Sequence, residues 1–333
     1  MLTYSQHYLF FILMITGVVT SISAPSWFSA WIGLELNLMS FIPLITSKSN
    51  AFSSEAALKY FLVQALGSSF IIMSAPLLSN TNLFSFVLLI SLLLKLGAAP
   101  FHFWFPPVME GLEWSKCIIL MTIQKIAPMF LISHLNFYPQ ANNLVLMSAF
   151  LSAIFGALGG LNQTSLRKIL AFSSINHLGW MLVAVVLSDY SWISYFMFYA
   201  AISASLTFYF SEHQLFYFPH LFLKKSNENF SAIISALSLL SLGGLPPFAG
   251  FIPKWIIMEI MISKGMTLLL LVLVLCSAVT LYFYLRLSIV SLLLKTSKKK
   301  LFYPPGVYNS SYTPIILSLN MFLLLVPSLF MLF

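Results

Sequence analysis

Long apolar runs recur from one end of the sequence to the other and constrain the fold more than any other feature. Each run is about 20 residues long, which is the length of α-helix that crosses a hydrocarbon core of about 30 Å. Charges are scarce, because Asp, Glu, Lys and Arg make up only 7% of the 333 residues while hydrophobic residues make up 60%. No charged stretch is long enough to fold as a separate soluble domain. The sequence therefore predicts a single all-α, polytopic transmembrane domain that occupies residues 1–333.

About eleven transmembrane helices are predicted. The first run has no basic segment before it and no small-residue cleavage site after it, so we expect it to be retained as a span. The predicted spans cover approximately residues 5–23, 26–46, 56–78, 83–107, 115–136, 143–160, 165–187, 191–211, 230–262, 266–290 and 313–333.

Basic residues between the predicted spans are distributed unevenly. If the chain crosses the membrane at every span, one side holds Lys264 alone, and the N-terminal side holds Lys48, Lys116, Arg167, Lys168, Lys224, Lys225, Lys295, Lys298, Lys299 and Lys300. Lys and Arg accumulate on the side of synthesis, so this asymmetry places the N-terminus there and the C-terminus across the membrane. The net charge of +8 therefore reflects basic loops that orient the chain in the membrane. Nucleic acid is not predicted as a partner, because the Lys298–Lys300 run has no interleaved aromatic residues.

Two predicted spans contain interruptions of the same form. Leu96–Phe101 in span four and Leu242–Phe248 in span nine share Leu-Gly-x-x-Pro with a nearby Phe, and proline and glycine both weaken a helix. These spans are five crossings apart, which predicts inverted five-helix repeats with broken helices 4 and 9, at about 1–140 and 141–295, followed by a terminal helix at about 313–333. Corresponding breaks of this kind line the ion path of inverted-repeat transporters. The alternative is that the prolines only kink their helices.

Four ionisable residues lie deep inside predicted spans: Glu35, Lys95, Lys125 and Lys254. A charge near mid-membrane costs about 2.5–3.5 kcal/mol on insertion scales, so such residues are expected to face a hydrated interior or a partner. Burial disfavours the charged form of carboxylates and amines alike, which brings both closer to exchanging protons. Neighbouring helix axes are about 8–10 Å apart, so water or other side chains must bridge these groups. We predict that the four residues form a proton relay.

Two histidines are candidate bridges in this relay. His102 follows the first interruption and His177 lies inside span seven, and the ordinary pKa of histidine, near 6.5, suits proton transfer. A hydrogen-bonded structural histidine is the alternative for each. Lys59 lies near the start of span three, where it can pair with Glu55 or snorkel to the interface. Glu259 is either an exit-side carrier or a solvated charge at the end of its span.

No cofactor or metal site is predicted within this chain. Cys117 and Cys276 stand alone, without a CxxC pair, which gives no support for a disulfide, a zinc site or an iron–sulfur site. The sequence also contains no GxGxxG dinucleotide fingerprint. We expect any redox chemistry to take place in other chains.

Four ordered motifs carry a resemblance to a known family. They are Leu94–Trp104, Ile123–Pro128, Gly160–Lys168 and Gly244–Trp255. Together they resemble the mitochondrial NADH–ubiquinone oxidoreductase chain 2 family, the antiporter-like membrane-arm subunits of respiratory complex I. The resemblance extends from about residue 27 to about residue 286.

The resemblance implies roles for the buried charges. Glu35 and Lys95 would form the charged pair of one half-channel, Lys125 the central carrier, and Lys254 the carrier in the second broken helix. It also implies a subunit of H⁺-translocating NADH:ubiquinone reductase that moves protons from the matrix to the intermembrane space. NADH, FMN, iron–sulfur clusters and ubiquinone would be bound elsewhere in the assembly.

The expected location is the mitochondrial inner membrane, with the N-terminus in the matrix and the C-terminus in the intermembrane space. The partners implied are chains resembling 4, 4L and 6, accessory subunits, and lipids. Two other functions stay open at this point: a cation/proton antiporter subunit, and a structural scaffold that performs no transport of its own.

Overall fold

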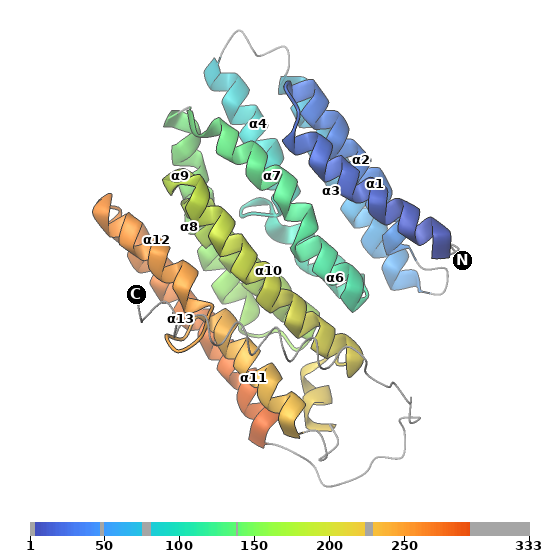
Figure 1. Ribbon diagram of the computed structural model, residues 1–333, viewed down its shortest axis with the longest axis vertical. Helices are drawn as coiled ribbons and strands as arrows, with labels where there is room; N and C mark the ends of the chain where they lie inside the picture. The colour runs from blue at the N-terminus through green and yellow to red at the C-terminus, as the bar shows by residue number, and fades with distance from the viewer. Residues whose placement is uncertain (1–3, 47–49, 75–80, 138, 224–228, 294–333) are drawn as a thin grey trace. The chain divides into compact units, whose positions relative to one another are not determined.

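The computed structural model describes residues 4–46, 50–74, 81–137, 139–223 and 229–293 (Figure 1). Within these ranges the regular structure is helical, apart from an isolated β-bridge between Ser165 and Tyr217. A helix is the form in which a single segment satisfies all its backbone hydrogen bonds inside lipid. The predicted all-α class is therefore confirmed for the described part of the chain.

The described residues form two compact units. Unit 1 contains the residues up to 152 together with 181–189, and unit 2 contains 153–180 and the described residues from 190 onward. In unit 1, α3 packs on α2 and α4, and α7 contacts both α1 and α4. The elements of unit 1 are α1 (Tyr4–Ile22), α2 (Trp27–Ile45), α3 (Ala51–Ser74), α4 (Thr81–Leu96), η2 (Phe101–Trp104), α5 (Phe105–Gly111), α6 (Trp114–Met121), α7 (Ile123–Ser133) and η3 (His134–Phe137).

Unit 2 is built around α13, which packs along α11 and also contacts α12 and η4. Two long helices, α8 and α9, each contribute residues to both units. These helices and the elements of unit 2 are α8 (Pro139–Gly160), α9 (Leu166–Leu187), α10 (Asp189–Glu212), η4 (Phe218–Leu223), α11 (Asn229–Gly243), α12 (Phe251–Ser263) and α13 (Thr267–Leu293).

Nine helical segments among the described residues are long and apolar enough to cross a bilayer, and they correspond to predicted spans one to eight and ten. They are Ser5–Ile22, Trp27–Ile45, Ala51–Ser74, Leu83–Gly111, Trp114–Asn136, Gln140–Gly160, Leu166–Leu187, Asp189–Glu212 and Thr267–Leu292. The predicted ninth span consists of two shorter helices, α11 and α12. The predicted eleventh span, 313–333, lies outside the described residues.

The fifth span is also divided, although the sequence analysis treated 115–136 as continuous. Helix α6 ends at Met121 and α7 begins at Ile123, and the residue between them, Thr122, has non-helical dihedral angles of φ −117° and ψ −80°. The Thr122 hydroxyl donates a hydrogen bond to the carbonyl of Ile118 at 2.7 Å. Such back-bonding to the preceding turn bends helices, and here it accompanies a complete break.

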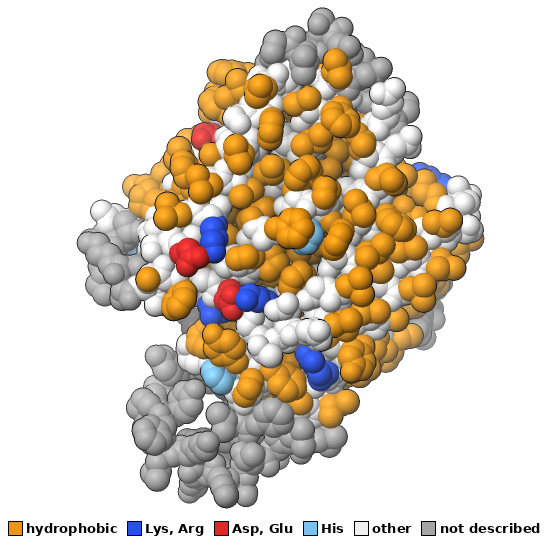
Figure 2. All heavy atoms as spheres, turned by 180° about the vertical axis from the view of Figure 1, so that it is seen from behind, with side chains coloured by type: hydrophobic (Ala, Val, Ile, Leu, Met, Phe, Trp, Pro, Cys, Tyr) orange, Lys and Arg blue, Asp and Glu red, His pale blue; other side chains and the backbone are white. Residues whose placement is uncertain are grey.

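The outer surface carries large apolar side chains that a soluble protein would bury. Figure 2 shows hydrophobic side chains spread over most of the face that it presents. Ile12, Leu58, Leu62, Leu271 and Leu275 are each more than half exposed. Monomeric soluble proteins rarely expose contiguous apolar patches of this kind. The exposed sides of these helices are therefore suited to contact lipid or neighbouring membrane chains.

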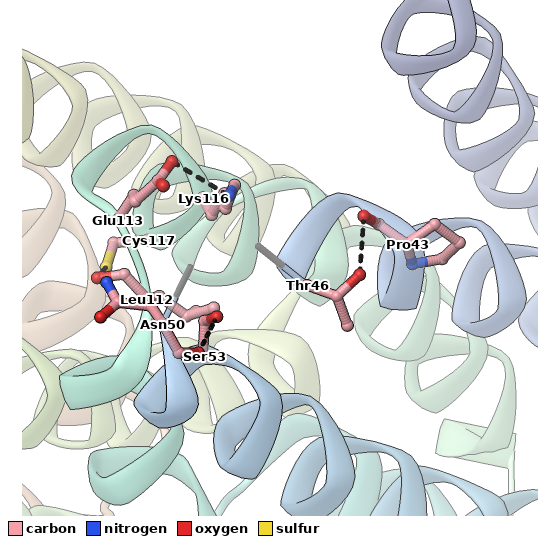
Figure 3. A network of polar contacts seen from close by, with 8 residues as sticks. All are labelled: Pro43, Thr46, Asn50, Ser53, Leu112, Glu113, Lys116 and Cys117. Carbon is pink, nitrogen blue, oxygen red and sulfur yellow. Dashed lines mark hydrogen bonds and ion pairs between the residues drawn. The ribbon is translucent and has the colours of Figure 1, made fainter. Parts of the chain in front are cut away.

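Hydrogen bonds and an ion pair stabilise the turns at one end of unit 1 (Figure 3). The Thr46 hydroxyl donates to a carbonyl one turn earlier at the end of α2, and the Ser53 hydroxyl does the same at the start of α3. Close to them, the turn from α5 to α6 carries an ion pair between Lys116 and Glu113 at 3.0 Å. The turns after spans two and four thus lie at the same end of unit 1, as they must if the spans cross alternately.

Glycine allows two helices to approach closely in unit 2. A Cβ atom added at Gly156 of α8 would lie 2.5 Å from the backbone nitrogen of Asn176 in α9. Real Cβ atoms do not come so near to a backbone atom, so any side chain at residue 156 would push the two helices apart. At Gly243, by contrast, the nearest atom to an added Cβ would be in the side chain of Leu281, at 3.4 Å, which is an ordinary van der Waals contact.

Replacing Gly156 by alanine is therefore expected to destabilise the folded protein by about 1–3 kcal/mol, the usual cost of overpacking. The same replacement at Gly243 serves as the matched control and should change stability much less. The two variants are compared by their thermal unfolding midpoints in detergent. Equal midpoints would show that α8 and α9 are not packed through Gly156.

Candidate functional site

Lys95 lies in the last turn of α4, immediately before the first predicted interruption. Its side chain is only 6% exposed, and its backbone carbonyl accepts a hydrogen bond from Gln64 Nε2 at 3.1 Å. Gly67 of α3 leaves room for the lysine chain, since an added Cβ there would lie 2.9 Å from Lys95 Cγ. The chain then turns at Gly97, where φ is +70°. The last turn of a helix is the favourable end for a cation, because the helix dipole is negative there.

Glu35 of α2 lies within electrostatic range of Lys95. The two side chains do not form a direct ion pair: neither contact within ion-pair distance in the described residues involves Glu35. One carboxylate oxygen of Glu35, Oε2, is buried and has no hydrogen-bond partner. Glu35 and Lys95 therefore interact electrostatically in unit 1 without a direct ion pair, and their role as a charged pair of a half-channel stays a prediction.

Lys125 lies in the first turn of α7, directly after the break at Thr122. Its side chain is 2% exposed and ranks among the largest fully buried side chains of the described residues. The ammonium nitrogen lies 5.2 Å from the ring centre of Phe105, within cation–π range. A helix N-terminus does not favour a cation, so Lys125 occupies a different electrostatic setting from Lys95.

Lys254 connects the two halves of the second broken helix. It lies in the first turn of α12, is 4% exposed, and donates a hydrogen bond from Nζ to the carbonyl of Gly243 at 2.9 Å. Gly243 is the last residue of α11, where carbonyl groups lack partners inside the helix. The ammonium group also lies 5.9 Å from the ring centre of Trp180. The ammonium group on α12 therefore provides a hydrogen-bond donor for the carboxyl end of α11. This is the end of a helix that favours positive charge.

Gly244 makes this arrangement possible. Its φ is +80°, a region that suits glycine, and an added Cβ would lie 2.8 Å from Lys254 Nζ. The glycine-proline sequence of the break thus provides both a change of backbone direction and the space that the lysine occupies.

His177 of α9 lies in unit 2 beside two tyrosines of α10. Its Nδ1 is 2.8 Å from the hydroxyl of Tyr195, and its ring centre is 5.1 Å from that of Tyr199. A small cavity, with space for about one water molecule, is bounded by His177 and Tyr199 and by Ser241 and Gly250 of the second broken helix. His177 therefore borders a small cavity whose lining is mostly apolar and includes a few polar groups.

His102 and the two peripheral charges have different surroundings. His102 is buried at η2, where its ring donates a hydrogen bond to the carbonyl of Pro100 and its ring centre lies 4.3 Å from that of Phe103, with the two rings tilted by 31°. Lys59 forms an exposed pair with Glu55, one turn earlier on α3. Glu259 is exposed on α12, whereas Lys254 on the same helix is buried. Lys59 and Glu259 are thus not brought together with the buried lysines.

The sequence analysis did not identify one set of residues at this site. Asn37, Tyr60 and Gln124 are uncharged, and they connect α2, α3 and α7 through hydrogen bonds between side chains. The available signal was the presence of amides inside otherwise apolar spans, which require partners there. Such residues are common enough in membrane helices that the signal alone does not identify a site.

Within the described residues, no group of three or more His, Cys, Asp or Glu side chains is arranged to hold a metal ion. Cys117 and Cys276 are both buried, and neither forms a disulfide bond. The polar groups near the helix breaks include amines, amides, hydroxyls, an imidazole and backbone carbonyls.

Comparisons with known proteins agree with this arrangement. A family model described as NADH:quinone oxidoreductase/Mrp antiporter, TM, matches residues 24–280. Among solved structures, a chain of respiratory complex I from Thermus thermophilus superposes with a TM-score of 0.85 at 24% identity, covering 97% of this chain and 78% of that chain. A chain of the Mrp complex from Dietzia superposes with a TM-score of 0.79 at 16% identity, covering 97% of this chain and 75% of that chain. These likenesses show that the fold is shared with antiporter-like subunits.

Closer relatives come from insects. NADH-ubiquinone oxidoreductase chain 2 of Anopheles gambiae is 49% identical over 290 residues, which is 84% of each chain. The protein of the same name from Aedes aegypti is 44% identical over 323 residues, covering 94% of this chain and 93% of the relative. The chain therefore belongs to the NADH-ubiquinone oxidoreductase chain 2 family, the antiporter-like membrane subunits of respiratory complex I.

Proposed function

We propose that this subunit translocates protons across the membrane through a relay whose principal groups are Glu35, Lys95, Lys125 and Lys254. The observation that carries the proposal is that each of the three buried lysines lies beside a break in its own helix. A helix break exposes backbone carbonyl and amide groups that can solvate an ammonium ion or a water molecule inside the membrane. His102 and His177 are the proposed bridges, and Lys59 and Glu259 are at most peripheral.

The chemistry follows from the groups that surround the lysines. Lys254 is held by a backbone carbonyl, and Lys125 faces an aromatic ring. A buried ammonium group depends on such protein groups, because water is excluded from around it. Losing a proton breaks one N–H bond of the ammonium group, and regaining a proton forms it again, while the rest of the side chain is unchanged. In this way a lysine can hold a proton in one step of the cycle and release it in the next.

Within the relay, Glu35 is the acidic member that modulates Lys95. The two groups interact electrostatically. Because they do not form a direct ion pair, the amine is not held permanently in its charged form. In this proposal, a water molecule in the cavity at His177 carries protons between the second broken helix and α9. Moving one charge against 100 mV costs about 2.3 kcal/mol, which we attribute to NADH oxidation and ubiquinone reduction in other subunits.

We further infer how the chain is placed in its membrane. The excess of Lys and Arg on the N-terminal side supports an N-terminus in the matrix, a C-terminus in the intermembrane space and proton movement from the first to the second. The corresponding breaks support inverted repeats at about 1–140 and 141–295. The relatives support a place in the mitochondrial inner membrane and in the complex I assembly. The family resemblance implies neighbours there that resemble chains 4, 4L and 6.

A second candidate function is exchange of another cation for protons. It is favoured by the likeness of the fold to a chain of the Mrp complex, and by the antiporter named in the matching family. Transport that requires sodium would support this function, whereas unchanged transport in sodium-free medium supports proton translocation alone. A scaffold without transport of its own is distinguished by the variants described next.

Replacing Lys125 by methionine in the assembled complex is expected to lower the number of protons pumped per NADH oxidised, because the central carrier is lost. Lys125→Arg should have a similar effect while keeping the charge, since arginine does not release its proton at accessible pH. Lys264→Met, at an exposed position, is the matched control and should pump normally. Proton uptake into proteoliposomes measures the effect. Unchanged stoichiometry in a fully assembled Lys125→Met or Lys125→Arg complex would refute the carrier role.

Replacing Gly244 by alanine is expected to reduce pumping without removing any ionisable group. The added methyl group would displace Lys254 Nζ from the Gly243 carbonyl, and the positive φ would add strain of about 1–2 kcal/mol. Gly265→Ala is the control, because Gly265 also has a positive φ, of +72°, but nothing lies within 4 Å of its added Cβ. If both variants lower pumping equally, strain alone explains the effect and the placement of Lys254 does not matter.

A further inference from the structure

Three uncharged side chains from three helices form a continuous hydrogen-bonded chain in unit 1. Gln124 of α7 donates from Nε2 to Asn37 Oδ1 of α2 at 2.9 Å. The hydroxyl of Tyr60, on α3, donates to Gln124 Oε1 at 3.2 Å. Both ends of the Gln124 amide are therefore engaged, each by a different helix. We refer to Asn37, Gln124 and Tyr60 as the amide bridge.

The amide bridge is buried. Asn37 is 3% exposed and Tyr60 is 2% exposed, while Gln124 is half-buried. An amide or phenol that is removed from water without a partner is costly, whereas a satisfied network fixes the geometry of the groups that form it. The bridge therefore holds the three helices at defined positions relative to one another. A set of apolar residues of the same size would allow α7 to shift or rotate more freely.

The amide bridge also lies between the charged groups of the proposed relay. Gln124 directly precedes Lys125, and both are in the first turn of α7. Tyr60, at one end of the bridge, is close enough to Glu35 to interact with it electrostatically. One end of the bridge is thus beside the carboxylate, and its centre is attached to the segment that carries the central lysine.

Aromatic packing connects the same tyrosine to the break at Lys95. The ring centre of Tyr60 lies 6.0 Å from that of Trp104. The indole nitrogen of Trp104 in turn donates to the carbonyl of Leu94, one residue before Lys95, at 3.1 Å. Tyr60 therefore contacts the supports of both lysines in unit 1, although it carries no charge itself.

We propose that the amide bridge is a positioning network that couples the Glu35–Lys95 pair to Lys125. This inference deepens the proposed proton relay and rests on it. A change in the charge of Glu35 acts on the dipole of the Tyr60 hydroxyl, and this hydroxyl is bonded to the amide next to Lys125. The coupling thus passes through one phenol and one amide, and the segment that responds is the first turn of α7, beside a helix break.

The test removes the Tyr60 hydroxyl and keeps its ring. Tyr60→Phe preserves the packing on Trp104 and on Phe41, whose ring centre is 5.2 Å away, so the complex is expected to assemble. The rate of NADH-driven proton pumping per assembled complex should fall about fivefold, the effect of one lost hydrogen bond. Tyr209→Phe, at a buried tyrosine in unit 2, is the matched control and should pump at the normal rate. Normal pumping by Tyr60→Phe would overturn the proposal.

A second variant separates coupling from simple stabilisation. Gln124→Met keeps the length of the side chain but removes both hydrogen bonds of the bridge. If the bridge acts as one network, Gln124→Met lowers pumping at least as much as Tyr60→Phe, and combining the two adds no further loss. Additive losses would overturn the proposal, as would a lower melting temperature of the complex with unchanged pumping.

Failure of this proposal is distinguishable from failure of the relay itself. If Lys125→Met abolishes pumping while Tyr60→Phe and Gln124→Met pump normally, the relay stands and the positioning role is wrong. If Lys125→Met also pumps normally, both are wrong. The positioning role is supported when all three variants lose pumping at normal assembly and the Tyr209→Phe complex does not.

Discussion

The arrangement of this chain depends on how an ammonium group is accommodated inside a membrane span. Hydrocarbon offers no partner, so the protein must provide one from its own backbone or side chains. The hydrogen bond from Lys254 to the carbonyl of Gly243 is the clearest example, because the carbonyl is available only where α11 ends. A continuous helix would have used that carbonyl internally. The break in the helix therefore supplies the hydrogen-bond acceptor that the buried lysine needs.

This relationship explains why much of the site could be predicted from the sequence. Glycine and proline act locally on the backbone, so the interruptions at Gly97–Pro100 and Gly243–Pro247 are visible without knowledge of the fold. A lysine inside an apolar run can also be recognised from the sequence, since the free-energy cost of placing its charge in the membrane does not depend on which helix is its neighbour. The proximity of Glu35 to Lys95 was inferred from a family resemblance, because distances between helices are not encoded in any local pattern.

Two features could not be predicted, for physical reasons. The break before Lys125 occurs at Thr122, where neither glycine nor proline is present, and the hydroxyl bond to Ile118 competes with the helix only in a particular tertiary setting. The amide bridge depends on side chains from three helices that are far apart in the sequence. Amides such as Asn37 and Gln124 are ordinary in membrane helices, and only their mutual contact distinguishes them.

The three lysines are equally buried but not equivalent. Lys95 lies at the carboxyl end of α4, and Lys254 reaches the carboxyl end of α11, so both charges are placed where a helix dipole attracts them. Lys125 is at the amino end of α7, where the dipole opposes a cation, and its ammonium group lies over the ring of Phe105. The helix dipole thus favours a proton held at Lys95 or Lys254 and disfavours one held at Lys125. In a relay with this asymmetry the central lysine is the group most sensitive to its surroundings, which is why a network that fixes its position matters for transfer.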